Sequence, residues 1–144
     1  MNIKHLITFI LMILLCTTLI IAQNDIKTYV NDYANIISPQ VEAQITQILQ
    51  PIHTAGVAEI AIVTVKSLEG KEINNYAYDL AEGKLGDITK NNGLLLLIAV
   101  EDRKYRFEVG RGLEGELNDA KVGRIGRQFL VPSFKENNYE GGIL

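Results

Sequence analysis

The residues best suited to chemistry lie in a glycine-rich loop in the last third of the sequence. Segment 110–116 reads Gly-Arg-Gly-Leu-Glu-Gly-Glu, and its three glycines let the backbone turn tightly and approach a ligand. Asn91 and Asn92 offer neutral amide oxygens from an earlier loop. Hard carboxylate oxygens, the kind that Ca²⁺ and Mg²⁺ prefer, come from Glu114, Glu116 and Asp119. These residues could form a divalent-cation site, but an acidic loop at a helix start is more often a capped, solvated turn, and spacing alone favours the turn.

Other kinds of site find little support. The glycine spacing matches neither a P-loop nor a dinucleotide fingerprint, which argues against nucleotide binding. After the first 22 residues the chain has one histidine, His53, and no Gly-x-Ser-x-Gly elbow, which argues against a Ser-His-Asp hydrolase. No cluster of cysteine and histidine suggests zinc. The charged run 101–104 is more typical of a hairpin tip than of acid and base catalysts.

The beginning of the chain has the layout of a secretory signal. Residues 6–22 carry no charged side chain, and Lys4 and His5 precede them. The small residue Ala22 predicts cleavage after position 22. An uncleaved anchor is the alternative, because the apolar run approaches the roughly 18 to 20 residues that cross a bilayer. Lipidation of Cys16 is disfavoured because Leu15 precedes it. We expect an exported protein, periplasmic, extracellular or lumenal, either free or anchored to a membrane.

Cleavage removes the single cysteine, so the mature chain can form neither an internal disulfide nor a thiolate site. The remaining residues, 23–144, have the usual size of one domain. The net charge of the whole sequence is −3, and loss of Lys4 makes it more negative. Because this charge is mildly acidic and no basic cluster occurs, a nucleic-acid surface is not expected. We expect a monomer.

Three segments predict a sheet. Residues 58–65 and 93–100 are apolar at nearly every position, which is typical of strands covered on both faces. Residues 105–109 alternate strictly between apolar and polar types and follow a short charged turn, which predicts an antiparallel hairpin with the strand before. The segment 27–37 is apolar but irregular and predicts no defined element.

Helices are predicted between and after these strands. Ser38-Pro39 starts the first, and Pro51 is expected to bend or end it. The second follows Gly70 and makes a right-handed parallel crossover. The third begins near Asn118 and ends at Pro132. Its inward-facing residues are expected to be Val122, Ile125, Phe129 and Leu130, with Gly123 and Gly126 allowing close approach to the sheet.

These elements predict a three-layer α/β/α sandwich with a small mixed sheet. Residues 139–144 look like the start of one more helix, cut off by the end of the sequence, so we expect the chain to be truncated there. Ligands favour the loops at the strand ends of such sheets. One edge gathers Ser67, Glu69, Glu101 and Asp102. The other, chemically richer, gathers Asn91, Asn92, Gly93, the 110–116 loop and Asp119.

Several segments, in this order, resemble the TPM domain family. They are YVNDYANIIS at 29–38, IAIVTV at 60–65, NGLLLL at 92–97, DRK at 102–104 and EVGRGLEG at 108–115. The resemblance extends over 27–144. This is the family of the thylakoid-lumen acid phosphatase, photosystem II repair factors and a modulator of acetylcholine receptors.

The resemblance implies a Rossmann-like α/β/α sandwich on the non-cytoplasmic side of a membrane. It also implies Asp32, from the opening segment, as a candidate ligand. The expected metal site is therefore Asp32, Asn91, Asn92, Glu114 and Asp119. Asn91 stands where many relatives have an acidic residue, which removes one charge from the site. Arg111 stands where relatives commonly have an aromatic residue, and it could contact an anionic substrate or be solvated.

Two functions follow from these residues and this resemblance. The first is an extracytoplasmic module that binds Ca²⁺ or Mg²⁺ and acts with a membrane-associated partner. The alternative is a metal-dependent acid phosphatase of weak activity, in which the cation would polarise phosphate and activate water. In that alternative Asp32 or Asp119 would be the base and Arg111 would stabilise negative charge.

Overall fold

The computed structural model describes residues 24–144. The predicted signal segment, residues 1–22, lies outside the described residues. The elements are β1 (Val30–Asp32), α2 (Pro39–Thr54), β2 (Glu59–Val65), α3 (Ile73–Ala81), β3 (Gly93–Ala99), β4 (Lys104–Val109), the 3₁₀ turn η1 (Arg111–Leu113), α4 (Asp119–Ile125), the π turn η2 (Gly126–Leu130), α5 (Val131–Lys135) and α6 (Tyr139–Ile143). Within this part of the chain, no helix is long and apolar enough to cross a membrane.

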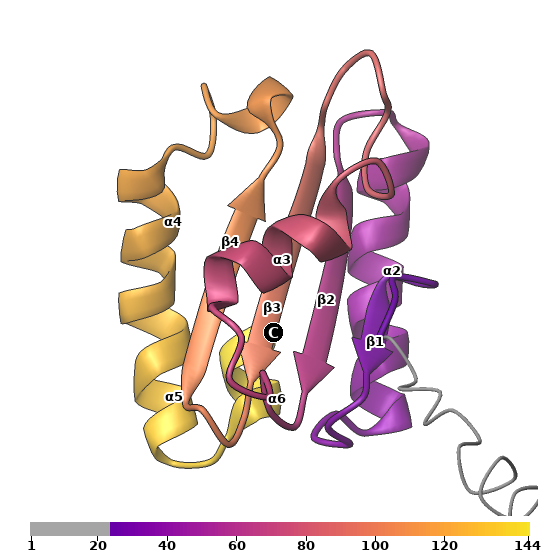
Figure 1. Ribbon diagram of the computed structural model, residues 1–144. Coiled ribbons are helices and arrows are strands. Elements are labelled where there is room, and N and C mark those ends of the chain that lie inside the picture. Colours follow the sequence, from indigo (N-terminus) through magenta and orange to yellow (C-terminus); the bar gives the residue numbers. More distant parts are fainter. Residues whose placement is uncertain (1–23) are drawn as a thin grey trace, which may run out of the picture.

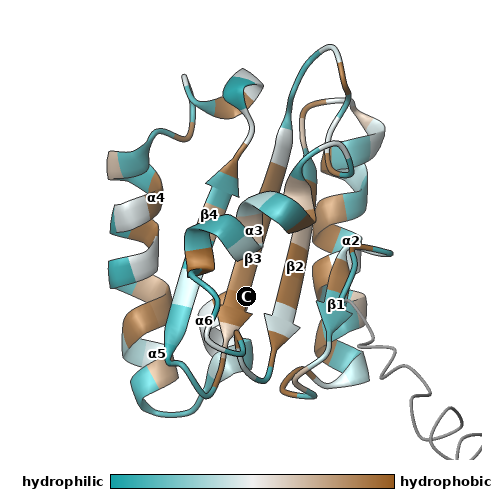
Figure 2. Cartoon of the chain, viewed as in Figure 1, coloured by the Kyte–Doolittle hydropathy of each residue, from teal (hydrophilic) through white to brown (hydrophobic). Residues whose placement is uncertain are grey.

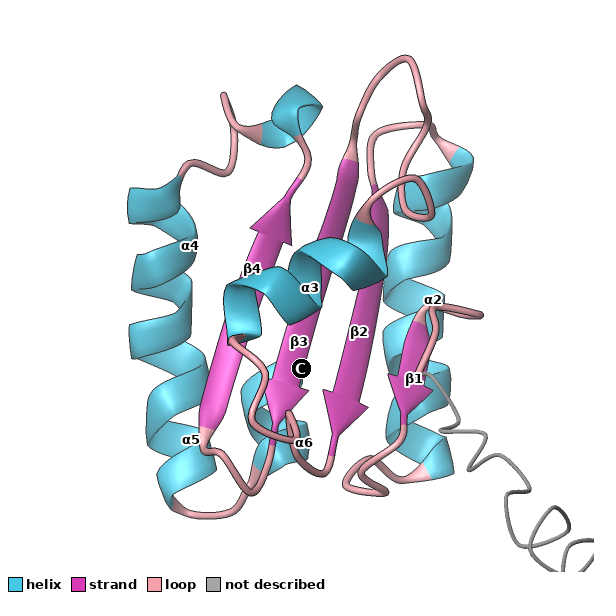
Figure 3. Ribbon diagram, in the orientation of Figure 1, coloured by secondary structure: helices cyan, strands magenta, loops and turns pink. Residues whose placement is uncertain are grey.

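The four strands form one mixed sheet in the order β1-β2-β3-β4 (Figure 3). The first three are parallel, and β4 is antiparallel to β3, which confirms the predicted crossover and hairpin. Only β1 was not predicted, because three residues are too few to show an alternating pattern. Its pairing reaches only Ile62–Thr64 of β2. In the described part of the chain, Glu59–Ala61 therefore have no strand on that side.

Helices cover both faces of the sheet, which confirms the three-layer sandwich (Figure 1). One face packs on α3, where Ala77 and Leu80 meet alternate residues of the two central strands. The other face packs on α2 and on the C-terminal helices, through Ile45 and Leu130 among others. Because both faces are covered, β2 and β3 are apolar along most of their length (Figure 2).

Neither proline predicted at a helix end stops its helix. Pro51 was expected to bend or end the first helix, and it lies inside α2, which continues to Thr54. Pro132 does not end the third helix either, because it falls in the first turn of α5, where a backbone donor is not needed. Between α4 and α5 the π turn adds a residue to the helical repeat and rotates the side chains that follow. As a result Phe129, predicted to face inward, is 52% exposed.

Candidate functional site

The chemically richer edge predicted from the sequence holds a cavity of about 500 Å³. It lies at the end of the sheet where β3 begins and β4 ends, at the top of Figure 1, beside the loop that follows α3. Its polar lining, which we name the acidic pocket, comprises Tyr78, Glu82, Asp87, Asn91, Glu108, Arg111 and Glu114.

Main-chain contacts between two loops build this pocket. The amide of Gly112 donates to the carbonyl of Asn91 at 2.9 Å, and the amide of Gly110 donates to that of Gly93 at 2.8 Å. A Cβ at Gly112 would overlap the carbonyl of Lys90, and one at Gly110 would overlap that of Asn91. These two glycines therefore serve loop packing, whereas the sequence suggested approach to a ligand.

Asn92 is a structural residue beneath the pocket. Its side chain is buried, and its Oδ1 accepts from the amide of Asp87 at 2.9 Å. Its Nδ2 donates to the carbonyl of Val57 at 3.1 Å. Asn92 thus joins the loop after α3 to the turn before β2. Asn91, in contrast, is exposed, and its φ of 50° lies in the left-handed region that asparagine tolerates.

Negative charge predominates in the acidic pocket. Four carboxylates line it, and Arg111 is the single cation in its lining. Arg106 lies two residues before Glu108 on β4, and its guanidinium is 3.4 Å from the Glu108 carboxylate. Hydrogen bonds from Thr89 and from the Lys90 amide lower the pKa of Asp87.

Tyr78 and Glu82 form a pair at the rim of the pocket. The Tyr78 hydroxyl donates to the Glu82 carboxylate, and this hydrogen bond raises the pKa of Tyr78 above its ordinary value. Nearby Arg111 acts in the opposite direction, and Glu108 raises this pKa further. The sequence reasoning missed Tyr78 and Glu82, which lie outside the buried stripe of α3. It also missed Glu108, although the alternation in β4 puts Arg106 and Glu108 on one face.

The structure brings together only part of the predicted metal site. Asn91 and Glu114 line the acidic pocket, Asn92 lies beneath it, and Asp119 begins α4 outside the lining. Asp32 lies at the opposite end of the sheet, where its carboxylate accepts from the Thr64 hydroxyl and from the amides of Ile36 and Ile37. Asp32 therefore closes the turn after β1. Over residues 24–144, no three Asp, Glu, His or Cys side chains converge as metal ligands.

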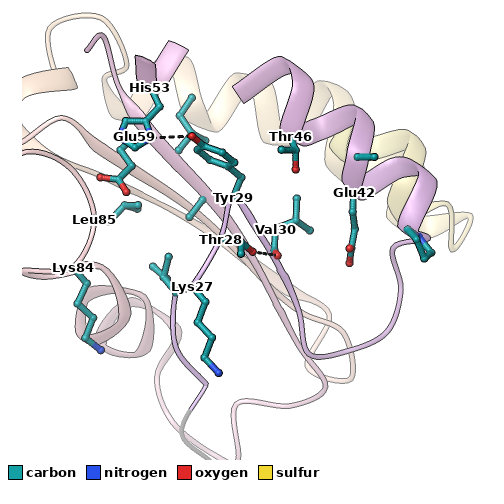
Figure 4. Close-up of a pocket in the computed structure, with 15 residues that line it drawn as sticks. Lys27, Thr28, Tyr29, Val30, Glu42, Thr46, His53, Glu59, Lys84 and Leu85 are labelled. Carbon is teal, nitrogen blue, oxygen red and sulfur yellow. Dashed lines mark hydrogen bonds between the residues drawn. The ribbon is translucent and has the colours of Figure 1, made fainter. Parts of the chain in front are cut away.

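A larger cavity, of about 720 Å³, lies between α2, β1 and β2 (Figure 4). It contains none of the predicted site residues. Its lysines, Lys27 and Lys84, are offset by Glu42 and Glu59. His53 has its Nδ1 2.9 Å from the Tyr29 hydroxyl and joins the end of α2 to the segment before β1.

The comparisons with known proteins agree with this fold. The sequence model of the TPM domain family matches residues 30–144. The N-terminal domain of a protein from P. gingivalis, solved in solution, is 32% identical, with a TM-score of 0.72, over 80% of this chain and 74% of that one. The N-terminal domain of a Corynebacterium glutamicum protein, also solved in solution, is 17% identical, with a TM-score of 0.63, over 87% of this chain and 78% of that one. This second likeness shows the fold alone.

No curated protein matches the sequence. The family match extends over most of the chain, and the described fold is that of the P. gingivalis domain. The chain therefore belongs to the TPM domain family.

Proposed function

We propose that this TPM domain binds a divalent cation, Ca²⁺ or Mg²⁺, in the acidic pocket. The observation that supports this is the charge of the lining, in which Glu82, Asp87, Glu108 and Glu114 outnumber Arg111, although Arg106 outside the lining pairs with Glu108. Carboxylates gathered at one cavity repel one another, and a hard cation with oxygen ligands relieves that repulsion. The amide oxygen of Asn91 adds a neutral ligand of the kind that Ca²⁺ accepts.

The proposed ligand set is narrower than the sequence suggested. Asn91 and Glu114 remain in it, with Glu108 and Asp87 as additions. Asn92 holds the loop, and Asp119 lies one short segment away at the start of α4. Asp32 is left out because it is at the other end of the sheet. Since the carboxylates do not converge, the cation would keep several water ligands, as Mg²⁺ in particular usually does.

The cation would serve a partner at a membrane, outside the cytoplasm. The apolar, uncharged start of the sequence supports export. The exposed residue Ile88 supports binding of a partner protein. Ile88 lines the same cavity and is 93% exposed. An apolar side chain at the rim of a charged pocket is suited to an interface in which binding the cation alters the surface that a partner meets.

The test of cation binding is a titration of residues 23–144 with CaCl₂ and MgCl₂, followed by amide NMR shifts. We expect shifts at Asn91, Glu108 and Glu114, and about tenfold weaker binding in Glu114→Gln, because loss of one charged ligand lowers affinity. Glu136→Gln, a substitution in an exposed residue on the other end of the molecule, should leave affinity unchanged. Binding that is equal in both variants would contradict the proposed ligands.

The partner is tested separately. Because residues 23–144 contain no cysteine, Ile88→Cys gives a single position for a photo-cross-linker. We expect adducts with a membrane protein that disappear on chelation, and none from Gln128→Cys on the exposed surface of η2. Adducts that persist after chelation would show that the partner binds without the cation.

The second candidate function is a metal-dependent acid phosphatase. The position of Arg111 favours it. Its guanidinium lines the acidic pocket and could bind a phosphate oxygen. A bound cation would supply Lewis-acid activation, and Asp119 is the remaining candidate base at this edge. We expect release of phosphate from phenyl phosphate to be lost in Arg111→Gln and on chelation. Release that survives both changes would exclude this site as the source.

A further inference from the structure

A third cavity, whose charge is opposite to that of the acidic pocket, lies at the other end of the sheet. It occupies about 420 Å³ between the turn that joins β3 to β4 and the helices α5 and α6, at the lower end of Figure 1. We name it the basic cleft. Its lining residues are Ile98–Val100, Arg103–Tyr105, Val131, Phe134, Lys135, Asn137 and Tyr139.

Three aromatic rings form one wall of the cleft. The Phe134 ring lies 4.9 Å from the Tyr139 ring and 6.4 Å from the Tyr105 ring, measured between centroids. All three side chains are half-buried, so each ring packs on the core beneath it and keeps part of its surface at the cavity. Such rings offer a contact area for a flat or branched apolar group.

The rim of the cleft carries three cations without carboxylate partners. The ion pairs in residues 24–144 are Lys84 with Asp25 and Arg106 with Glu108. Arg103, Lys104 and Lys135 are in neither pair, although the whole chain has a net charge of −3. The described lining includes no carboxylate.

The acidic residues near these cations in the sequence lie outside the lining of the cleft. Asp102 accepts a hydrogen bond from the Leu68 amide at 2.8 Å, and Glu140 accepts one from the Ser38 amide. Glu101 and Glu136 are exposed and lie outside the lining. Arg103, Lys104 and Lys135 are therefore the charged side chains of the described lining.

The backbone conformation of the turn between β3 and β4 does not explain why residue 103 is an arginine. Its φ of 52° lies in the left-handed region, which glycine and asparagine adopt at lower cost than arginine. An arginine in this position is explained if its side chain, directed to the cleft rim, has a use of its own.

We propose that the basic cleft binds an organic anion in which an aromatic or branched apolar body carries a carboxylate or phosphate group. The body would lie on the rings of Tyr105, Phe134 and Tyr139, and the charged group would meet the cations of the rim. This site is separate from the acidic pocket, which has the opposite charge and lies at the other end of the sheet.

The ligand class is tested by NMR titration of residues 23–144, since the N-terminal domains of two relatives fold in solution by themselves. The probes are phenylacetate and phenyl phosphate, with 2-phenylethanol as the neutral analogue and acetate as the anion without a ring. We expect phenylacetate or phenyl phosphate to shift the signals of Tyr105, Phe134 and Lys135 with half-saturation at about 1 mM, which is usual for small fragments.

The controls use the same signals. About tenfold more 2-phenylethanol than phenylacetate should be needed for the same shift, and acetate should cause no shift. The reason is that the ring and the charged group both contribute to binding. The tighter of the two aromatic anions identifies the charged group. Shifts confined to the acidic pocket, or equal binding of the neutral alcohol, would overturn the proposal.

Substitutions test the same site from the protein side. The double variant Arg103→Asn and Lys135→Gln keeps a residue suited to the left-handed turn and removes two charges. We expect phenylacetate to bind about tenfold more weakly, because removal of each exposed charge should lower the affinity about two- to fivefold. Binding of 2-phenylethanol should be unchanged. Arg124→Gln, in an exposed residue of α4, is the matched control and should bind as the unaltered chain does. A folded double variant with unchanged phenylacetate affinity would contradict the proposal.

Discussion

The two ends of the sheet are built in different ways. At the acidic pocket, loops from distant parts of the sequence touch through their main chains, as Gly112 and Asn91 do. At the basic cleft, side-chain rings from β4, α5 and α6 line the space between the turn and the helices. A main chain cannot move aside as a side chain can. Identical changes should therefore have larger effects at the acidic pocket than at the basic cleft.

The largest effect is expected where backbone meets backbone. Gly112→Ala should lower the free energy of unfolding by about 3 kcal/mol or more, because its Cβ would overlap the Lys90 carbonyl. Gly115→Ala, in the same loop but with open space around it, should change stability by less than about 1 kcal/mol. Urea denaturation of both variants measures the difference, and similar values would show that the loop contact yields easily.

Asn92→Ala should come next, with a loss of about 2 to 3 kcal/mol in the free energy of unfolding. The change leaves the Asp87 amide and the Val57 carbonyl without the partner that the buried side chain provides. Asn91→Gly, at the exposed neighbour with left-handed backbone, should be nearly neutral. Thermal unfolding of the pair measures this contrast, and a neutral Asn92→Ala would mean that water replaces the amide.

A glycine near the basic cleft provides the opposite case. A Cβ at Gly126 would overlap the Tyr105 ring, a side chain that can shift. We expect Gly126→Ala to cost about 1 to 2 kcal/mol, less than Gly112→Ala, because ring movement relieves part of the overlap. Denaturant midpoints measure both. A larger loss at Gly126 than at Gly112 would reverse the distinction between the two ends.

The smallest effect concerns pH at the acidic pocket. Hydrogen bonds from Thr89 and the Lys90 amide lower the pKa of Asp87 in the folded protein. The stability that these bonds contribute is thus full above the unfolded-state pKa and is lost as pH falls through the folded-state pKa. Amide hydrogen exchange at Thr89 and Lys90 should quicken, relative to Asp87→Asn, over that acid range. Parallel pH profiles in the two proteins would contradict this assignment.

Strong local patterns made most of the fold predictable. Residues 58–65 and 93–100 are apolar enough to identify two central strands, and Asn118 marked the start of α4 correctly. The π turn left no such pattern, so the direction of Phe129 was wrong. The register of a helix after one extra residue depends on packing against Tyr105 and its neighbours, which no local pattern encodes.

The candidate site was less predictable than the fold. Glu114 and Asn91 lie at the predicted edge, but Glu82, Asp87 and Glu108 reach it from other segments. Their proximity depends on how loops cross at the end of the sheet, a long-range property. The position of Asp32 at the opposite edge required the direction of β1, which a three-residue strand does not reveal in sequence.

The short β1 has a consequence for solubility. Because it pairs with Ile62–Thr64 only, the outer side of Glu59–Ala61 borders the cavity in Figure 4 and could accept a strand from another molecule. Lys27 and Lys84 line that same cavity. Lysines beside an open strand edge oppose edge-to-edge association, since a second chain would have to bury their charges. We expect these two lysines to disfavour such pairing at this edge.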